Sequence, residues 1–247
     1  MSKIKWLFLM TMLFSMGISS CFIDIDDDDG DFFGCIDGDG PIISEELFLD
    51  DFDGIRLELS ARVVITQGPT QSVVVEGKQN IIDELDLDVR GGIWEIETNE
   101  CVSDIGNMTF FITIPVIRSL TIAGSGEIVS PEVLVVDDID VSILGSGDID
   151  LGLDADDIEA IISGSGQIRL EGIADDIDIE IDGSGDYRGF NMETRTAFVR
   201  IAGSADVNLR VLEELIVRIS GSGDVRFRGN PALDVIINGS GEVIDAN

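Results

Sequence analysis

Residues 179–186 read Ile-Glu-Ile-Asp-Gly-Ser-Gly-Asp, and this cassette or a close variant of it occurs seven times in the second half of the chain. The copies begin at Gly124, Gly145, Gly164, Gly183, Gly203, Gly221 and Gly239, so they are 18 to 21 residues apart. One copy alters the triplet to Gly203-Ser204-Ala205. A nearly fixed period of about 20 residues is typical of a solenoid, in which each repeat is one coil stacked on its neighbours.

Apolar residues alternate with polar ones on both sides of each cassette. The residue two positions before it is always isoleucine: Ile122, Ile143, Ile162, Ile181, Ile201, Ile219 and Ile237. A period of two predicts a strand with one buried face, and coils stacked at about 4.8 Å would align these residues in an interior ladder. A second ladder follows the cassette, from Ile128 and Leu151 to Val225 and Phe227, and we expect Tyr187 and Gly189 to interrupt it.

The glycines predict a sharp corner at the same place in every coil, since glycine reaches positive φ without a Cβ penalty. A second corner, often acidic as at Asp157 and Asp176, lies seven residues before each cassette. The return arm varies in length, which makes it the natural place for binding loops. Hairpin folds would need alternating strand directions. The prediction is therefore an all-β, right-handed parallel β-helix with coils of about 18–21 residues, spanning residues 47–247.

Residues 47–115 contain short strand patterns without the cassette, so they form either irregular first coils or a small separate sheet domain. Residues 1–20 have a basic start and an apolar stretch too short to span a membrane, which predicts a secretory signal. Small residues precede Cys21, as in a bacterial lipobox, and predict acylation of Cys21. The alternative is an ordinary cleaved signal in which this cysteine is incidental. Residues 21–46 are rich in Asp and Gly and predict a solvated tether.

Asp26, Asp27, Asp28 and Asp29 follow closely behind Cys21. They resemble the export signal that sends lipoproteins of Bacteroidota to the outer face of the outer membrane. We therefore expect an outer-membrane protein, lipid-anchored and exposed at the cell surface. A periplasmic orientation, with the aspartates acting only as a spacer, is the alternative.

Several motifs in order resemble one family. They are Phe52-Asp53-Gly54-Ile55, Val64-Ile65-Thr66-Gln67-Gly68, Ser72-Val73-Val74-Val75-Glu76-Gly77 and Ile114-Pro115, followed by the Gly-Ser-Gly ladder. Together they are similar to the putative auto-transporter adhesin, head GIN domain family, over about residues 48–245. The resemblance implies a secreted or lipid-anchored β-helix protein of Bacteroidota. It names no ligand and so transfers no binding residues.

Charge and composition exclude several kinds of chemistry. A net charge of −34 disfavours nucleic acid, whose phosphates need Lys and Arg, and also anionic lipid surfaces. The chain has no histidine, so the serines of the cassettes cannot form a Ser-His-Asp triad and zinc ligands are scarce. Cys35 and Cys101 are the cysteines left after lipidation. In an oxidising envelope they either pair as a disulfide or remain free thiols.

An acidic column is predicted two residues after each serine, consisting of Glu127, Asp148, Gln167, Asp186, Asp206, Asp224 and Glu242. Stacked carboxylates repel one another, and weak structural calcium would offset that repulsion. Turn capping by the carboxylates needs no metal, and it is our first interpretation. Arg169, Arg188 and Arg226 lie two residues further on the same face and are expected to neutralise part of this column. We therefore expect no cofactor, with structural calcium as the alternative.

Two classes of function fit these features. The first is a non-catalytic adhesin or binding scaffold that presents a rigid flank to a glycan or protein ligand. The alternative is a β-helix enzyme acting on polysaccharide as a lyase or hydrolase. An enzyme would need acids combined with Lys or Arg where the repeat is broken, and the one such break is Tyr187-Arg188-Gly189-Phe190, with Arg195 nearby. This is too little to indicate catalysis, because a fold does not imply a function.

Overall fold

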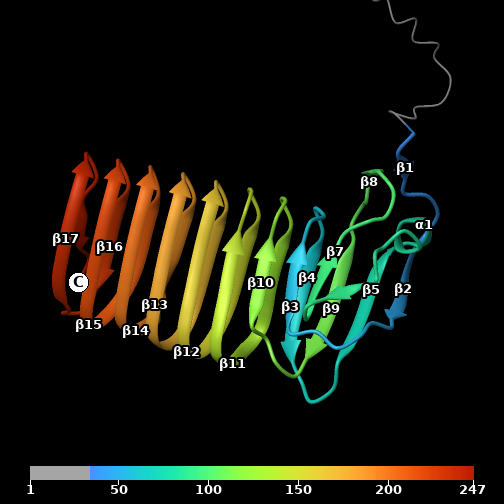
Figure 1. The fold of residues 1–247 in the computed structure, drawn as a ribbon, viewed down its shortest axis with the longest axis horizontal. Helices are drawn as coiled ribbons and strands as arrows, with labels where there is room; N and C mark the ends of the chain where they lie inside the picture. Colours follow the sequence, from blue (N-terminus) through green and yellow to red (C-terminus); the bar gives the residue numbers. More distant parts are fainter. Residues whose placement is uncertain (1–33) are drawn as a thin grey trace, which may run out of the picture. The chain divides into compact units, whose positions relative to one another are not determined.

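The computed structural model describes residues 34–247, which form almost entirely β-strands stacked into a solenoid (Figure 1). The predicted signal peptide, Cys21 and Asp26 to Asp29 lie outside the described residues. The first half contains β1 (Ile36–Asp37), β2 (Ile42–Leu47), β3 (Gly54–Leu57), β4 (Arg62–Gln67), β5 (Ser72–Lys78), α1 (Gln79–Ile82), β6 (Val89–Arg90), β7 (Ile93–Ile96), β8 (Val102–Asp104), β9 (Thr109–Ile114) and β10 (Ser119–Ile122). The repeats form β11 (Glu127–Ile143), β12 (Asp148–Gly164), β13 (Gln167–Gly183), β14 (Asp186–Gly203), β15 (Asp206–Gly221), β16 (Asp224–Arg228), β17 (Ala232–Gly239) and β18 (Val243–Asp245).

Each repeat is one coil that pairs in parallel with the next. Strands β11 to β15 are 16 to 18 residues long and follow one another in the sheet. Ile143 pairs with Ile162, and Ile162 pairs with Ile181, so equivalent positions stack in register. The predicted parallel β-solenoid is confirmed.

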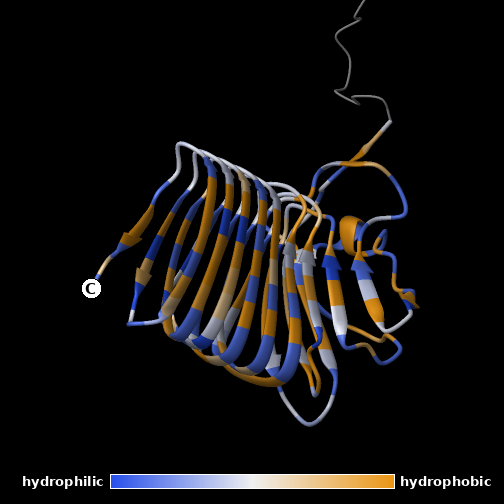
Figure 2. Ribbon diagram, turned by 60° about the vertical axis from the view of Figure 1, so that its left-hand side comes forward, coloured by the Kyte–Doolittle hydropathy of each residue, from blue (hydrophilic) through white to orange (hydrophobic). Residues whose placement is uncertain are grey.

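The alternating residues fill the interior as predicted. Ile143, Ile162 and Ile181 are all 0% exposed, as are Ile128 and Ile168 in the second ladder. Figure 2 shows the result as hydrophobic and hydrophilic segments that alternate along each coil. Because every interior side chain packs against the same position of two neighbouring coils, the core is a continuous column and not a set of separate clusters.

The Gly-Ser-Gly corners are held by backbone hydrogen bonds between coils. The Ser184 N–H donates to the Gly164 carbonyl oxygen at 2.9 Å, and the same bond recurs at every cassette after the first. Gly183 has φ of 135°, and a Cβ there would collide with the backbone of Gly164. A Cβ on Gly185 would meet the side chain of Ile162. The first glycine therefore permits close stacking of the corners, and the third leaves room for the isoleucine ladder.

Apart from β8, the strands within residues 47–115 belong to the same sheet as the repeats. Strand β3 pairs in parallel with β10 and β7, and β4 pairs in parallel with β11 and β9. Ser60 occupies the serine position of this early coil, and its hydroxyl lies 2.9 Å from that of Ser125. The first of the two sequence interpretations, irregular coils, describes this region, although part of it is an antiparallel cap. In that cap, β5 pairs with β2 and β9.

The folded unit begins earlier than the predicted tether boundary at residue 46. Strand β2 pairs antiparallel with β5, and Leu47 at its end is buried. Cys35 and Cys101 form a disulfide with their Cα atoms 4.6 Å apart, and β1 pairs with β8 beside it. The Asp- and Gly-rich composition concealed these strands, because a strand with one partner and a single buried face needs few apolar residues.

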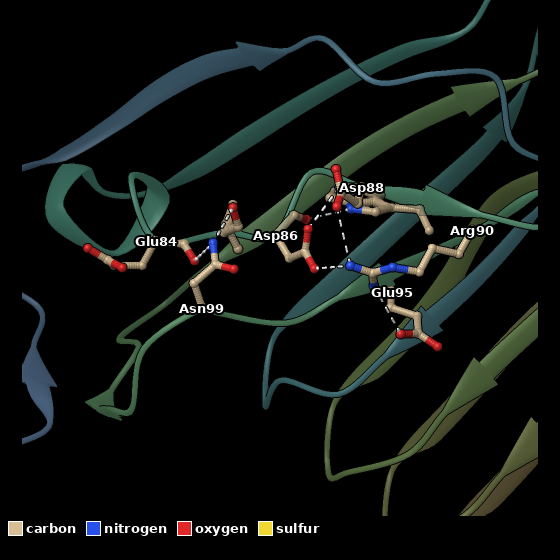
Figure 3. A network of polar contacts seen from close by, with 8 residues as sticks. Glu84, Asp86, Asp88, Arg90, Glu95 and Asn99 are labelled. Carbon is tan, nitrogen blue, oxygen red and sulfur yellow. Dashed lines mark hydrogen bonds and ion pairs between the residues drawn. The ribbon is translucent and has the colours of Figure 1, made fainter.

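Polar contacts complete the cap around a buried tryptophan. Trp94 is 0% exposed, and its indole N–H donates to the Asp86 carbonyl oxygen at 3.0 Å. The Asp86 carboxylate accepts from Arg90 at 2.9 Å, and Arg90 also lies 3.6 Å from Glu95 (Figure 3). Hydrogen bonds from the Asp88 N–H and from Arg90 hold the pKa of Asp86 below its usual range. The network fixes the loop that closes the core at this end.

The opposite end of the stack has no such cover among the described residues. Leu233, Val235 and Ile237 of β17 continue the inward positions of β15 but are 50%, 37% and 37% exposed. The solenoid is thus capped at β2, β5 and α1 and open at β17. No helix within residues 34–247 has the length and apolar character needed to cross a bilayer.

Candidate functional site: an arginine-lined groove

A groove of about 340 Å³ lies on the variable arm of the coils, on β13, β14, β15 and β16. Its lining is Arg169, Leu170, Glu171, Arg188, Phe190, Asn191, Asn208 and Arg228. Three of these eight side chains are arginines, in a chain with only 15 Lys and Arg against 49 Asp and Glu. Basic residues are therefore concentrated at this place on an acidic protein.

Strand register places two of the arginines side by side. Arg169 pairs with Arg188 across β13 and β14, and Arg188 pairs with Asn208 across β14 and β15. Their neighbours in sequence, Ile168 and Leu170, are buried. Because side chains alternate along a strand, these polar groups all point outward from the coils.

An insertion in β14 shapes the groove. Gly189 pairs with Leu209 and Glu193 pairs with Arg210, so Phe190, Asn191 and Met192 have no counterparts on β15. Bulges of this kind re-aim side chains and are frequent beside binding sites. Phe190 is half-buried, and the guanidinium carbon of Arg228 lies 4.2 Å from the centre of its ring. Since β15 lies between β14 and β16, this cation–π contact crosses one coil.

The interior beneath the insertion differs from our expectation. We predicted that Tyr187 and Gly189 would interrupt the second ladder, but Tyr187 is 1% exposed and a Cβ on Gly189 would meet the Tyr187 ring. The ring thus occupies the space that Gly189 leaves vacant, and the ladder continues through it. Burial raises the pKa of the Tyr187 hydroxyl well above its usual range.

The arginines of the groove are only weakly engaged by carboxylates of the protein. Arg169 lies 3.1 Å from Asp150, and Arg188 lies 3.6 Å from Asp186. All four side chains are between 39% and 50% exposed, and exposed pairs of this kind contribute about 0–1 kcal/mol. Within residues 34–247, no carboxylate lies within ion-pair distance of Arg228, whose partner is Phe190. An incoming anion could therefore replace the weak ion pairs of Arg169 and Arg188 and bind Arg228 without displacing any carboxylate.

The predicted acidic column exists and is partly neutralised. Asp148, Gln167, Asp186, Asp206 and Asp224 stack in register. Arg226 contacts Asp206 at 3.1 Å and Asp224 at 3.2 Å, and Arg188 contacts Asp186. The expectation for Arg169 was wrong, because its partner is Asp150 in its own column and not a member of the acidic column. The corners themselves are joined by backbone hydrogen bonds. Within residues 34–247, the one backbone N–H that donates to a carboxylate of this column is that of Glu242, which bonds Asp224 of the neighbouring coil at 3.0 Å, so, contrary to our expectation, none of these carboxylates caps its own turn.

The second corner carries a further acidic groove, lined by Asp138, Asp157 and Asp176 with their neighbours. Loss of hydration and the adjacent carboxylates raise the pKa of Asp157. Arg195, which the sequence singled out with the Tyr187 segment, lies here and contacts Asp176 at 3.3 Å. It is not in the arginine-lined groove. Among the described residues, no group of three or more carboxylate or cysteine side chains is arranged to hold a metal ion.

The serines of the cassettes are exposed at the corners, and Ser184 is one example. Sequence reasoning found Arg188 and Phe190 through the break in the repeat, but it missed Asn191, Asn208 and Arg228. A signal for Asn208 exists in its position, which is equivalent to Arg169 and Arg188 in neighbouring coils. Arg228 could not be found in this way, because the insertion in β14 alters which residues lie opposite one another.

Residues 51–231 match the family described as "Putative auto-transporter adhesin, head GIN domain". The chain belongs to this family. Head GIN proteins are adhesin-like surface proteins by that description, and the resemblance noted in the sequence is confirmed. No protein among those with curated functions matches the chain.

Solved structures share the head GIN fold. A putative adhesin from Bacteroides fragilis NCTC 9343 has a TM-score of 0.78 at 19% identity, over 84% of this chain and 98% of its own. A putative lipid binding protein from Parabacteroides distasonis ATCC 8503 has a TM-score of 0.68 at 20% identity, over 85% and 99%. A putative adhesin from the same organism has a TM-score of 0.68 at 21% identity, over 84% and 98%. At this level of identity the likeness extends to the fold alone.

Proposed function

We propose that this head GIN protein is a non-catalytic lipoprotein of the outer membrane that binds a glycan or protein ligand at the cell surface. The observation that carries the proposal is the arginine-lined groove, which is the place where the variable arm, the break in the repeat and the basic residues coincide. The adhesin-like family supports a surface role.

The groove is better suited to binding than to hydrolysis. Its lining includes a single carboxyl group, that of Glu171, whereas most glycosidases place two carboxyl groups on opposite sides of the scissile bond. Neutral amides and guanidinium groups make up most of its polar surface. They can orient a ligand through hydrogen bonds, and neither the amides nor the guanidinium groups give up or accept a proton near neutral pH.

Binding is tested by screening the purified chain on glycan arrays and on cells. We expect retention of a ligand that the variant with Arg188→Gln and Arg228→Gln no longer binds. A chain that binds no glycan, no protein and no cell would contradict the proposal.

Anchoring and display are tested separately, because they depend on residues outside the described structure. A Cys21→Ser precursor should lose acyl labelling and leave the membrane fraction. If it stays membrane-bound, the anchor lies elsewhere. Changing Asp26 to Asp29 to Ala should abolish digestion by protease added to intact cells, and unchanged digestion would reduce these aspartates to a spacer.

A further inference from the structure

We infer that the arginine-lined groove selects a saccharide carrying a single acidic group, such as a terminal uronic acid. This inference rests on the proposed function, since it names the class of ligand for the same surface. Three guanidinium groups from β13, β14 and β16 border one groove, and a carboxylate can accept two parallel hydrogen bonds from one arginine.

Arg228 is the guanidinium best prepared to receive that carboxylate. Its stacking on the Phe190 ring restrains the plane of its donors, and it has no ion-pair partner within residues 34–247. Phe190 is therefore a positioning residue for Arg228. Arg188, on the strand that carries the insertion, supplies a second guanidinium whose contact with Asp186 is long at 3.6 Å.

The remaining lining suits the hydroxyl groups of a sugar. Asn191 and Asn208 each offer an amide that both donates and accepts hydrogen bonds, as a ring hydroxyl does. Leu170 and the Phe190 ring add apolar surface. A groove of about 340 Å³ lies at the small end of the range for ligand sites, so it fits one or two sugar units.

The charge of the whole protein limits the ligand to a weakly charged one. A chain of net charge −34 repels densely sulfated or phosphorylated polymers at long range, although it does not prevent a single carboxylate from reaching three arginines. Glu171 borders the same groove and adds a local penalty for anions. The groove thus discriminates by the number of acidic groups as well as by their presence.

The experiment compares a disaccharide ending in glucuronic acid with the same disaccharide ending in glucose, using calorimetry on the purified full chain. We expect the acidic sugar to bind at least tenfold more tightly. Arg228→Gln and Arg188→Gln should each weaken its binding about tenfold or more, and Glu171→Gln should strengthen it severalfold. Arg200→Gln is the matched control, because it removes the same charge from a site paired with Glu180 and outside the groove.

Equal binding of the two disaccharides, or loss of binding in Arg200→Gln as large as in Arg228→Gln, would overturn the inference. The inference would also be overturned if the chain bound another ligand more tightly than the acidic disaccharide. The ligands to compare are an acyclic analogue of glucuronate, an acidic peptide and heparin. If the chain binds cells or neutral glycans independently of Arg188 and Arg228, the inference fails while a surface-binding function stands. Thermal unfolding of each variant shows that the fold is retained.

Discussion

Tyr187 fills the interior space that the missing side chain of Gly189 leaves, so two departures from the repeat compensate each other. They lie directly before the insertion that carries Phe190 and Asn191 into the groove. The interior and the binding surface are therefore altered together at one point of β14.

The Tyr187–Gly189 pair predicts strong coupling. Gly189→Leu should destabilise the protein by about 1–3 kcal/mol through overpacking, and Tyr187→Val by about 3 kcal/mol through a cavity. The double variant should lose less than the sum, because valine and leucine restore the pattern of Val207 and Leu209 in the next coil. Chemical denaturation of all four proteins measures this coupling. Strict additivity would show that the two residues do not share one space.

The corner glycines predict a position-specific cost. Gly183→Ala should destabilise by about 1–3 kcal/mol, because alanine at φ of 135° is strained and its Cβ meets the Gly164 backbone. Ser184→Ala at the same corner is the control, since the serine side chain is exposed. The measurement is the melting temperature of the two variants and of the unaltered protein. Equal shifts for the two variants would mean that the corner does not require a glycine.

We expect the protein to become more stable when the charge of Asp157 is removed. Its folded-state pKa is raised, so its ionised form is less favourable in the folded than in the unfolded chain. That penalty is present above the folded-state pKa and disappears as the pH falls below the ordinary value of 3.8. Asp157→Asn should therefore raise the melting temperature slightly at pH 7 but not at pH 3. Asp154→Asn is the control, because the register partners of Asp154 are Val135 and Ile173. It should leave the melting temperature unchanged at both pH values.

At the capped end we expect the opposite effect, a loss of stability when the charge of Asp86 is removed. Its folded-state pKa is lowered, so its ionised form adds stability above pH 3.8, and this contribution is lost as the pH falls through the folded-state pKa. Asp86→Asn should lower the melting temperature at pH 7 by about 2–4 °C, the shift for about 1 kcal/mol in a domain of this size. Asp88→Asn is the milder control because its side chain is 79% exposed. An equal loss at pH 2 and pH 7 would contradict an electrostatic origin.

The sequence was sufficient to predict the repeats because each side chain there repeats its neighbours' environment. Ile162 and Ile181 could be placed inside from the period of two alone, and Gly183 at a corner from its spacing. The cap was harder, since the antiparallel pairing of β2 with β5 depends on contacts that no local pattern encodes. Glu58-Leu59-Ser60-Ala61 is a degenerate cassette whose register with Ser125 became clear only from the strand pairing.

The groove, too, was predictable from the sequence only in part. Arg188 and Phe190 could be singled out because they break a regular pattern. The contact of Phe190 with Arg228 joins residues two coils apart, and it depends on the length of β15 as well as on the insertion in β14. Such a contact comes from the difference between coils, which a repeat pattern by itself does not contain.

The disulfide between Cys35 and Cys101 also determines how the protein would carry mechanical load. The two cysteines are 66 residues apart, and β2 to β7 lie between them. A pull that enters the chain before Cys35 passes through the sulfur–sulfur bond to Cys101 and on to the coils, so the loop between them carries no tension. The covering elements β2, α1 and β5 lie within that loop, so traction along the chain enters the stack through β8 and β9 and bypasses the elements that cover the core.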